Sequence, residues 1–404
     1  MLIIIARNQR KINYAILFLK TQNIHLIKEI GMIPTYFNRL FNFNGKIITY
    51  NNGDYPFLKE FCPGIQIQFI KKAKRYNKIT ERNVLKYLLF NARKIDFLNL
   101  THYTDEVPIF GVFYKLLNRK GFLYLKLDAH EYFKKVDLYQ RDYRKAPYKG
   151  FLKILYFYLR MQLYKIFLKK VDLISIENKA LVAFFKKKYP ELKDKFIYIP
   201  NGIDDDYFKN SGISKIPFHE RENIILNVCR IGTIGKISEV LMYALAKIDD
   251  LKDWKVLYVG PIDKSFYKIC ETFFKTYPHL KEKIEFIGEV SDRKKLFEYY
   301  QKCKIFCLTT FYGSFEIVLV EALTNGCYLV SSNIPTAIDI TNNGTLGTIY
   351  QRGNEDDLAK KLQKVINNDE FIEQLYPKML KFAEKNFYWS EIIKKLYIEF
   401  FKRI

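Results

Sequence analysis

Short apolar runs rich in β-branched residues alternate with longer amphipathic stretches along most of the chain. This alternation is typical of parallel sheets whose strands are joined by crossover helices. In the first half it predicts strands at residues 23–27, 46–50, 65–70, 95–100, 122–127 and 171–176. Helices are expected between them, at residues 80–92, 108–118 and 148–170.

A short strand ending in Ile199-Pro-Asn-Gly-Ile-Asp204 interrupts this alternation, and an acidic, irregular stretch follows it as far as Glu222. Because Pro, Asn and Gly favour turns, we expect a domain boundary here. The alternation then restarts, with strands predicted at residues 223–228, 255–259, 283–287, 304–308, 328–331 and 348–351. Helices are predicted at residues 238–246, 264–276, 293–301, 316–325 and 355–368. The pattern therefore predicts two α/β domains, each with about six parallel strands.

Composition narrows the class of protein. The chain has 404 residues, of which 49% are hydrophobic and 27% charged, so a large core can form and wholesale disorder is excluded. No apolar run approaches 18 residues, and the first six residues are too short for the core of a signal peptide. The six cysteines include no CxxC pair and no histidine at metal-binding spacing. We therefore expect buried thiols in a cytoplasmic protein.

The basic charge is concentrated in one half of the chain. Residues 1–200 carry 38 basic and 15 acidic side chains, whereas residues 201–404 carry 29 and 28. The first half is therefore expected to face something anionic, unless the excess is only a solvated basic surface. Nucleic acid is disfavoured because no DNA- or RNA-reading motif is present.

An anionic membrane surface fits the charge better than nucleic acid does. The cluster Lys71-Lys-Ala-Lys74-Arg75 is strongly basic, and the expected helix at 148–170 interleaves aromatic residues with cations. That helix could equally pack on the core and present a solvated cationic face. We predict a cytoplasmic protein attached peripherally to the inner face of the membrane.

Polar residues at the predicted strand ends of the second half suggest a binding site. Arg230 and Lys236 follow the strand that ends at Val228, together with Gly232 and Gly235. This combination suits an anion such as a diphosphate, although a surface turn with incidental cations has the same appearance.

Two further junctions add to this site. Glu321 follows an apolar run, so its carboxylate should be buried and need a partner, either a ribose diol or a structural cation. The backbone around Gly288 and Val290, after another strand, could contact a nucleobase edge.

Several segments, in this order, resemble the retaining glycosyltransferases of family 4, which have the GT-B fold of two Rossmann-like domains facing a central cleft. The resemblance covers roughly residues 170–400 and is carried by Ile199-Pro-Asn-Gly-Ile-Asp204, Arg230 with Lys236, Val259-Gly-Pro-Ile262, Ile287-Gly-Glu-Val290, Phe315–Ala322 with Gly326, and Phe387-Tyr-Trp389-Ser-Glu391. It implies an acceptor-side domain at 1–203, a nucleotide-sugar-binding domain at 204–387, and a last helix at 388–404 that crosses back.

The resemblance also implies roles for individual residues. A UDP- or GDP-sugar would be the donor, with no cofactor and no metal, and the acceptor would be a glycan or a lipid-linked sugar. Arg230 and Lys236 would hold the diphosphate, Glu321 the ribose, and the backbone near Gly288 and Val290 the base. The loop and helix start that face the phosphates would comprise Gly313, Ser314, Phe315, Ile317 and Val318.

In the first domain, the resemblance points to a residue after a middle strand, either Asp128 or His130. The two differ by a two-residue register that the sequence leaves open, and His102 is a second strand-end histidine. Gly31 would lie in a loop that follows a strand and faces the donor, where the absence of a side chain allows close backbone approach.

One departure from the family pattern affects the expected site. The family has a glutamate eight residues before the one at 321, but this chain has Gly313 there, and Glu316 stands where the family has glycine. Either Glu316 reaches the transferred sugar from a rearranged loop, as a catalytic residue, or donor binding is altered or lost. The second alternative implies a catalytically weakened protein that acts as a membrane- or glycan-binding assembly partner.

Overall fold

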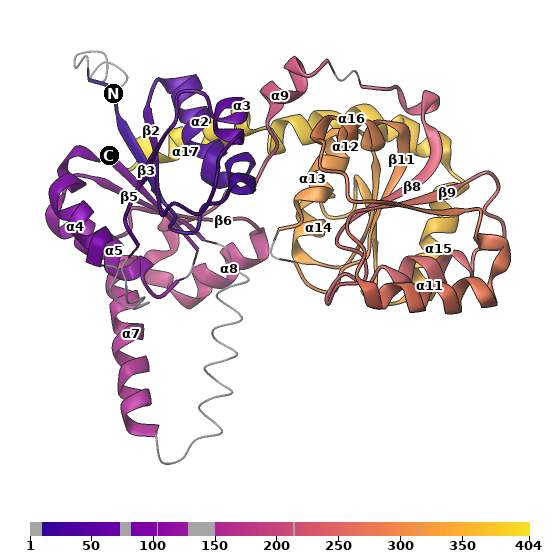
Figure 1. The fold of residues 1–404 in the computed structure, drawn as a ribbon, viewed down its shortest axis with the longest axis horizontal. Helices are drawn as coiled ribbons and strands as arrows, with labels where there is room; N and C mark the ends of the chain where they lie inside the picture. Colours follow the sequence, from indigo (N-terminus) through magenta and orange to yellow (C-terminus); the bar gives the residue numbers. More distant parts are fainter. Residues whose placement is uncertain (1–9, 73–81, 103, 128–149, 213–214, 314) are drawn as a thin grey trace. The chain divides into compact units, whose positions relative to one another are not determined.

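The computed structural model describes residues 10–72, 82–102, 104–127, 150–212, 215–313 and 315–404. The chain divides into two compact units, one formed by Met1–Asp204 with Trp389–Ile404 and the other by Asp205–Tyr388. Each unit contains a parallel sheet with helices packed along it (Figure 1).

The first unit has a seven-stranded sheet among its described residues, in the order β3-β2-β1-β4-β5-β6-β7. All its neighbouring strands run parallel. The strands are β1 (Asn13–Leu17), β2 (Asn44–Thr49), β3 (Gln66–Phe69), β4 (Phe97–Thr101), β5 (Phe122–Leu127), β6 (Leu173–Ile176) and β7 (Phe196–Tyr198). The helices are η1 (Asn23–Ile27), α2 (Glu29–Phe41), α3 (Phe57–Phe61), α4 (Arg82–Asn91), η2 (Ala92–Lys94), α5 (Val107–Leu117), α7 (Gly150–Lys170), α8 (Lys179–Lys188), η3 (Pro190–Lys195) and α17 (Trp389–Phe401).

The second unit has a six-stranded parallel sheet in the order β10-β9-β8-β11-β12-β13, again counted over the described residues. The strands are β8 (Glu222–Val228), β9 (Lys255–Val259), β10 (Ile284–Gly288), β11 (Cys303–Leu308), β12 (Tyr328–Ser332) and β13 (Gly347–Tyr350). The helices are α9 (Asp205–Asn210), η4 (Phe218–Glu220), α10 (Glu239–Leu245), α11 (Lys264–Thr276), η5 (Pro278–Leu280), α12 (Arg293–Lys302), α13 (Ile317–Thr324), α14 (Pro335–Ile340), α15 (Glu355–Ile366) and α16 (Asp369–Phe387).

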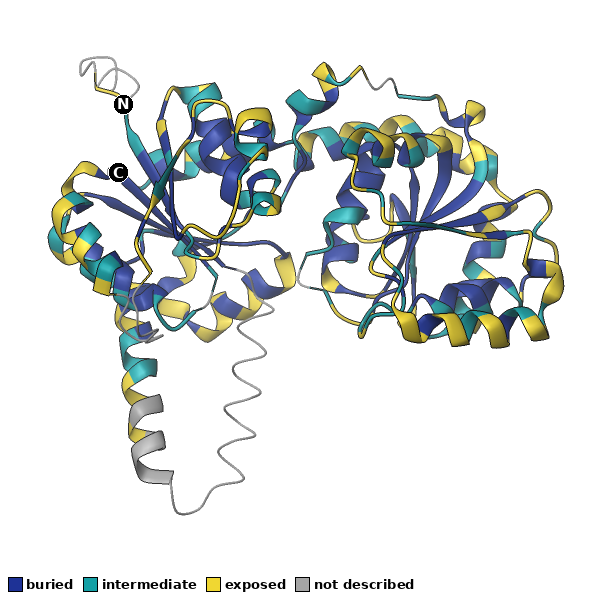
Figure 2. Ribbon diagram, viewed as in Figure 1, coloured by how far each residue is buried: buried dark blue, intermediate teal, exposed yellow. Residues whose placement is uncertain are grey.

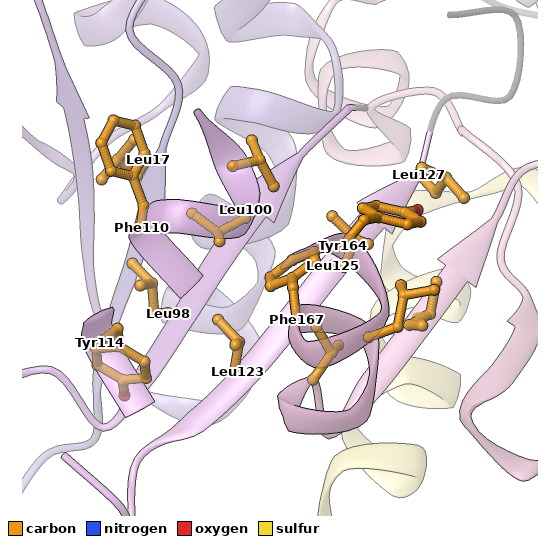
Figure 3. Close-up of a cluster of buried hydrophobic side chains, with 14 of the residues drawn as sticks. Leu17, Leu98, Leu100, Phe110, Tyr114, Leu123, Leu125, Leu127, Tyr164 and Phe167 are labelled. Carbon is orange, nitrogen blue, oxygen red and sulfur yellow. The ribbon is translucent and has the colours of Figure 1, made fainter. Parts of the chain in front are cut away.

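The core of each unit lies along its central strands. Figure 2 shows the strands as mostly buried, while the helices alternate between buried and exposed faces. In the first unit, Leu98 and Leu100 of β4 and Leu123 and Leu125 of β5 are covered by helices α5 and α7, with Phe167 between them (Figure 3). Continuous apolar strands of this kind are expected when helices cover both faces of a parallel sheet.

The helix α17 completes the core of the first unit, although it follows the second unit in sequence. Phe400 is fully buried and lies 5.4 Å from the ring of Phe37 and 5.1 Å from that of Phe97, measured between centroids. Tyr397 stacks on Phe41 at 3.8 Å. Aromatic burial of this extent makes α17 part of the fold rather than an appendage.

The observed strands agree closely with the predicted ones from residue 44 onward, and the α/β class is confirmed. The strand predicted at 23–27 is wrong, because this segment forms the 3₁₀ helix η1. Gln22 and His25 bond reciprocally at its start, and of its apolar residues only Leu26 is buried. The true first strand is β1, which the pattern analysis missed, so the first sheet has seven strands rather than about six.

Replacing Phe400 by alanine should destabilise the first unit by about 3–5 kcal/mol, because it leaves a cavity among stacked rings. Urea denaturation followed by the fluorescence of Trp389, in a Trp254→Phe background, measures this change. Ile398→Ala on the same helix is the control, since Ile398 is 52% exposed and should change stability by at most about 0.5 kcal/mol. Equal effects of the two substitutions would contradict a structural role for α17.

Candidate donor-binding site

The candidate site lies at the carboxyl ends of β8 and β11, neighbouring strands at the middle of the second sheet. The chain runs from β8 outward to β9 on one side, whereas β11 lies on the other side. Such a reversal of strand order leaves a crevice where open α/β sheets bind ligands. The Asn227 side chain, which is buried, fixes the two strands by donating from Nδ2 to the carbonyl oxygen of Cys307 at 2.7 Å.

The loop after β8 holds the two predicted cations. Gly232 and Gly235 have φ angles of 72° and 89°, which favour glycine. A Cβ at Gly232 would lie 2.6 Å from the Cβ of Phe266, so the loop is packed tightly there. The resulting turn exposes Arg230 and turns Lys236 toward the loop after β11.

Backbone and side-chain hydrogen bonds join these two loops. The amide of Phe311 donates to the carbonyl oxygen of Gly235 at 2.8 Å, and the hydroxyl of Thr310 lies 2.9 Å from the same oxygen. The ring of Tyr312 lies over Gly235, where a Cβ would come within 3.0 Å of it. The two loops therefore form one surface. The spacing of motifs along the chain does not predict this contact.

The central contact of this surface is an ion pair between Lys236 and Glu316. The Nζ atom of Lys236 lies 2.6 Å from both carboxylate oxygens of Glu316 and 3.4 Å from Oγ1 of Thr310. The two charged side chains are only 15% and 13% exposed. The lysine expected to bind a diphosphate is therefore neutralised by a carboxylate of the same chain.

Gly313 and Glu316, the two exchanged residues, are packed against each other. A Cβ built on Gly313 would lie 2.2 Å from Oε1 of Glu316, which is closer than real Cβ contacts. A side chain at 313 would thus begin in the space that the Glu316 carboxylate fills. The observed position of the Glu316 carboxylate therefore depends on a glycine at 313.

Glu321 is buried in α13 and already has protein partners. Its Oε1 lies 3.3 Å from Nη2 of Arg293, and its Oε2 accepts from the hydroxyl of Tyr300 at 3.2 Å. Burial, followed by the nearby Glu321 charge, raises the pKa of Tyr300 well above its usual value, so the phenol remains a donor. Sequence reasoning foresaw the need for a partner but not Arg293 or Tyr300, because α12 meets α13 only in the fold.

The other predicted donor-side residues lie around the same edge of the sheet. Gly288, with φ 79°, ends β10, and a Cβ there would meet nothing within 4 Å, so its backbone is open to approach. Val290 follows it and is partly exposed. Phe315, Ile317 and Val318 are also partly exposed at the start of α13. Ser314, Asp128 and His130 lie outside the described residues.

Gly31 does not lie in a loop after a strand, which corrects the sequence prediction. It lies in the first turn of α2, directly after the 3₁₀ helix η1, and it is buried. A Cβ on Gly31 would lie 2.0 Å from the carbonyl oxygen of Leu26. The missing side chain therefore serves the packing of α2 on η1, and the space is filled by protein backbone.

His102 directly follows β4, at the corresponding reversal point of the first sheet, between β1 and β4. Its φ of 63° is left-handed, and its ring packs edge-on against Phe18 at 5.2 Å between centroids. Phe18 also contacts His25, whose pKa is lowered by burial and by Lys28.

Neither a metal site nor a membrane span is found among the described residues. No group of three or more His, Cys, Asp or Glu side chains there could hold a metal ion. No helix in that part of the chain is long and apolar enough to cross a membrane.

The fold defines the class of protein. The chain superposes on the Anabaena protein Alr3699/HepE, whose structure holds UDP and glucose, with a TM-score of 0.66 over 97% of this chain and all of that one, at 16% identity. The predicted GT-B fold is thereby confirmed.

Sequence comparison relates the second unit to a family of enzymes. Residues 209–384 match the family model described as glycosyl transferases group 1, so the chain resembles these enzymes through its second unit. It is 26% identical over 222 residues to the GalNAc-alpha-(1->4)-GalNAc-alpha-(1->3)-diNAcBac-PP-undecaprenol alpha-1,4-N-acetyl-D-galactosaminyltransferase of Campylobacter jejuni, and 26% identical over 202 residues to the phosphatidyl-myo-inositol mannosyltransferase of Mycobacterium leprae. These alignments cover 54% and 50% of this chain, and 58% and 52% of the two relatives.

Replacing Glu321 by leucine should destabilise the second unit by about 1–3 kcal/mol, because Arg293 and the hydroxyl of Tyr300 would be left buried without this acceptor. Urea denaturation followed by Trp254 fluorescence, in a Trp389→Phe background, tests this. The control is Glu298→Leu on α12, an exposed position expected to change stability by at most about 0.5 kcal/mol. If both variants unfold at the same urea concentration as the parent, Glu321 has no structural role.

Proposed function

We propose that this protein is a retaining glycosyltransferase that moves a sugar from a UDP- or GDP-sugar to a glycan or lipid-linked acceptor in surface polysaccharide biosynthesis. The observation that carries the proposal is the contact between two loops at the reversal point of the second sheet, in the region that matches the group 1 family. The loop after β8 carries Arg230 and Lys236, and the loop after β11 leads into α13, which carries Glu321. Relatives with polyprenol-linked and lipid acceptors in their names support the acceptor class.

In this proposal the two cations stabilise the departing nucleoside diphosphate. Negative charge grows on the leaving group as the glycosidic bond to the donor breaks, and guanidinium and ammonium groups held beside it lower the barrier. Such cations do this without a metal, so we expect transfer in the presence of EDTA. Glu321 would accept the ribose hydroxyls with its remaining lone pairs, and the open backbone near Gly288 and Val290 would meet the base.

The acceptor side belongs to the first unit in this proposal. By the family resemblance, Asp128 or His130 is the catalytic candidate of the first unit, and Glu316 is that of the second. The competing hypothesis, a catalytically weakened protein that assists assembly at a membrane or glycan, draws on the neutralised Lys236. Turnover separates the two hypotheses, since a weakened protein would release no nucleotide.

Incubation with a panel of UDP- and GDP-sugars and lipid-linked acceptors should release UDP or GDP. Arg230→Ala should weaken nucleotide binding at least about tenfold, because an exposed guanidinium forms strong charge-assisted bonds with phosphate. Lys268→Ala on α11, which removes an exposed cation elsewhere in the same unit, is the matched control and should bind as the parent does. Silence across the whole panel would refute transferase activity.

We also propose that the first unit attaches peripherally to an anionic membrane, at the cytoplasmic face where lipid-linked acceptors are presented. Helix α4 packs on α5, and α5 packs on α7. These neighbouring helices carry large apolar side chains that are each 54–67% exposed, namely Leu89, Phe90, Leu116, Tyr158 and Leu159. We propose that these side chains form one apolar surface, because a contiguous exposed surface of this kind marks an interaction site.

Basic residues accompany this apolar surface. Arg82 and Lys86 are exposed on α4 at helical spacing from Leu89 and Phe90, and Lys94 is exposed just after them. Lys71 and Lys72 of the predicted basic cluster are exposed too, whereas Lys74 and Arg75 lie outside the described residues. Apolar and basic side chains together favour an anionic lipid surface over a neutral one.

Lys86→Glu combined with Lys94→Glu should lower co-sedimentation with phosphatidylserine-containing vesicles at least about tenfold, because each basic residue near such a surface contributes about 1 kcal/mol. Vesicles of neutral lipid should bind neither the parent nor this double variant. Lys360→Glu with Lys364→Glu makes the same charge change on an exposed helix of the second unit and should leave sedimentation unchanged. Equal sedimentation of the two double variants would exclude this surface as the attachment site.

A further inference from the structure

Lys236 forms an ion pair with Glu316, so an external anion can bind its ammonium group only in competition with the Glu316 carboxylate. Both carboxylate oxygens of Glu316 lie at hydrogen-bond distance from its Nζ, and both side chains are mostly buried. The pair has no net charge, which leaves Arg230 as the exposed cation of the loop. An incoming diphosphate would therefore meet a carboxylate at the position where it needs an ammonium group.

Glu316 occupies this position without being fastened by other contacts. It immediately precedes α13, and its side chain makes no capping hydrogen bond with the amides of that helix. Within the described part of the chain its carboxylate hydrogen-bonds only to Lys236. A carboxylate is favoured near the first amides of a helix, which also favour an external anion. The Glu316 carboxylate and a ligand phosphate would thus compete for the Lys236 ammonium group and for the start of α13.

We propose that Glu316 is an internal competitor for the Lys236 site, so that a diphosphate binds only by displacing its carboxylate. This inference deepens the proposed function, on which it rests for the identity of the ligand. It makes Glu316 a residue that sets donor affinity. It also assigns a purpose to Gly313, which provides the space that the carboxylate needs when it pairs with Lys236.

The crowding at Gly313 gives a second way to break the pair. Replacing Gly313 by alanine puts a methyl group where Oε1 of Glu316 lies, and the flexible carboxylate is the part that can move. Gly313→Ala therefore separates Glu316 from Lys236 without altering any charge. Glu316→Gln removes the carboxylate charge instead. Two chemically unrelated substitutions are thus expected to have one effect.

The test is calorimetric titration of the full chain with inorganic pyrophosphate and with UDP or GDP. Glu316→Gln and Gly313→Ala should each tighten pyrophosphate binding at least about fivefold, the lower end of typical coupling between sites. The double variant should bind no more tightly than the better single variant, because both substitutions remove the same competitor. Glu282→Gln, which removes an exposed carboxylate elsewhere in the unit, should stay within about twofold of the parent.

Unchanged or weaker pyrophosphate binding by Glu316→Gln would overturn the inference, and weaker binding would mean that Glu316 itself contacts the ligand. Tightening by Glu282→Gln to the same extent would also overturn it, since the effect would then be general charge. Urea denaturation of each variant checks that it is folded, and Glu316→Gln carries the test if Gly313→Ala is not. Pyrophosphate has neither base nor sugar, so this result is independent of whether the sugar panel shows transfer.

Discussion

The pairing of β8 with β11 is the constraint on which the second unit depends. These strands are far apart in sequence, yet their parallel register and the bond from Asn227 to Cys307 hold them side by side. Parallel strands send their following loops to one edge of the sheet, so the loops at 229–237 and 309–316 must meet there. The hydrogen bonds of Thr310 and Phe311 to Gly235, and the ion pair of Lys236 with Glu316, form because these two loops are in contact.

The charge balance of the site follows from the same geometry. A lysine on one loop and a glutamate on the other become an ion pair because both are shielded from water and nothing else in the described structure satisfies them as closely. Breaking a half-buried pair is unfavourable unless a new counter-ion replaces the old one. A diphosphate is such a counter-ion, whereas an uncharged ligand is not, so the pair also favours anionic ligands over neutral ones.

In the first unit, aromatic side chains build the core, and many basic side chains lie at the surface. Its stability comes from stacked aromatic rings that bring α17 onto α2 and β4, and from the junction residue Asp204, which accepts from the Tyr36 hydroxyl at 2.7 Å. Some of its basic side chains serve the fold, since Lys126 of β5 is buried and donates to the carbonyl oxygen of Ile199. Others, such as Lys86 and Lys94, are exposed, and net charge of this kind bears on association and not on fold.

Local sequence was sufficient for most of the fold. Apolar runs predicted eleven of the strands to within a few residues, because a strand buried on both faces must be continuously apolar. The prediction failed where one sequence pattern is compatible with two structures. The apolar run at residues 23–27 was predicted as a strand but forms a 3₁₀ helix. Gly31 was predicted to leave room for the donor, but the space beside it is filled by the backbone of Leu26. The pairing of Lys236 with Glu316, of Glu321 with Arg293 and Tyr300, and of Gly313 with the Glu316 carboxylate could not be read from the sequence. The ion pair and the two Glu321 contacts join residues that are 21 to 80 positions apart, and only the packing of the sheet and its helices brings those side chains within hydrogen-bond distance. Gly313 and Glu316 are close in sequence, but the carboxylate lies beside Gly313 because it pairs with Lys236 from the other loop.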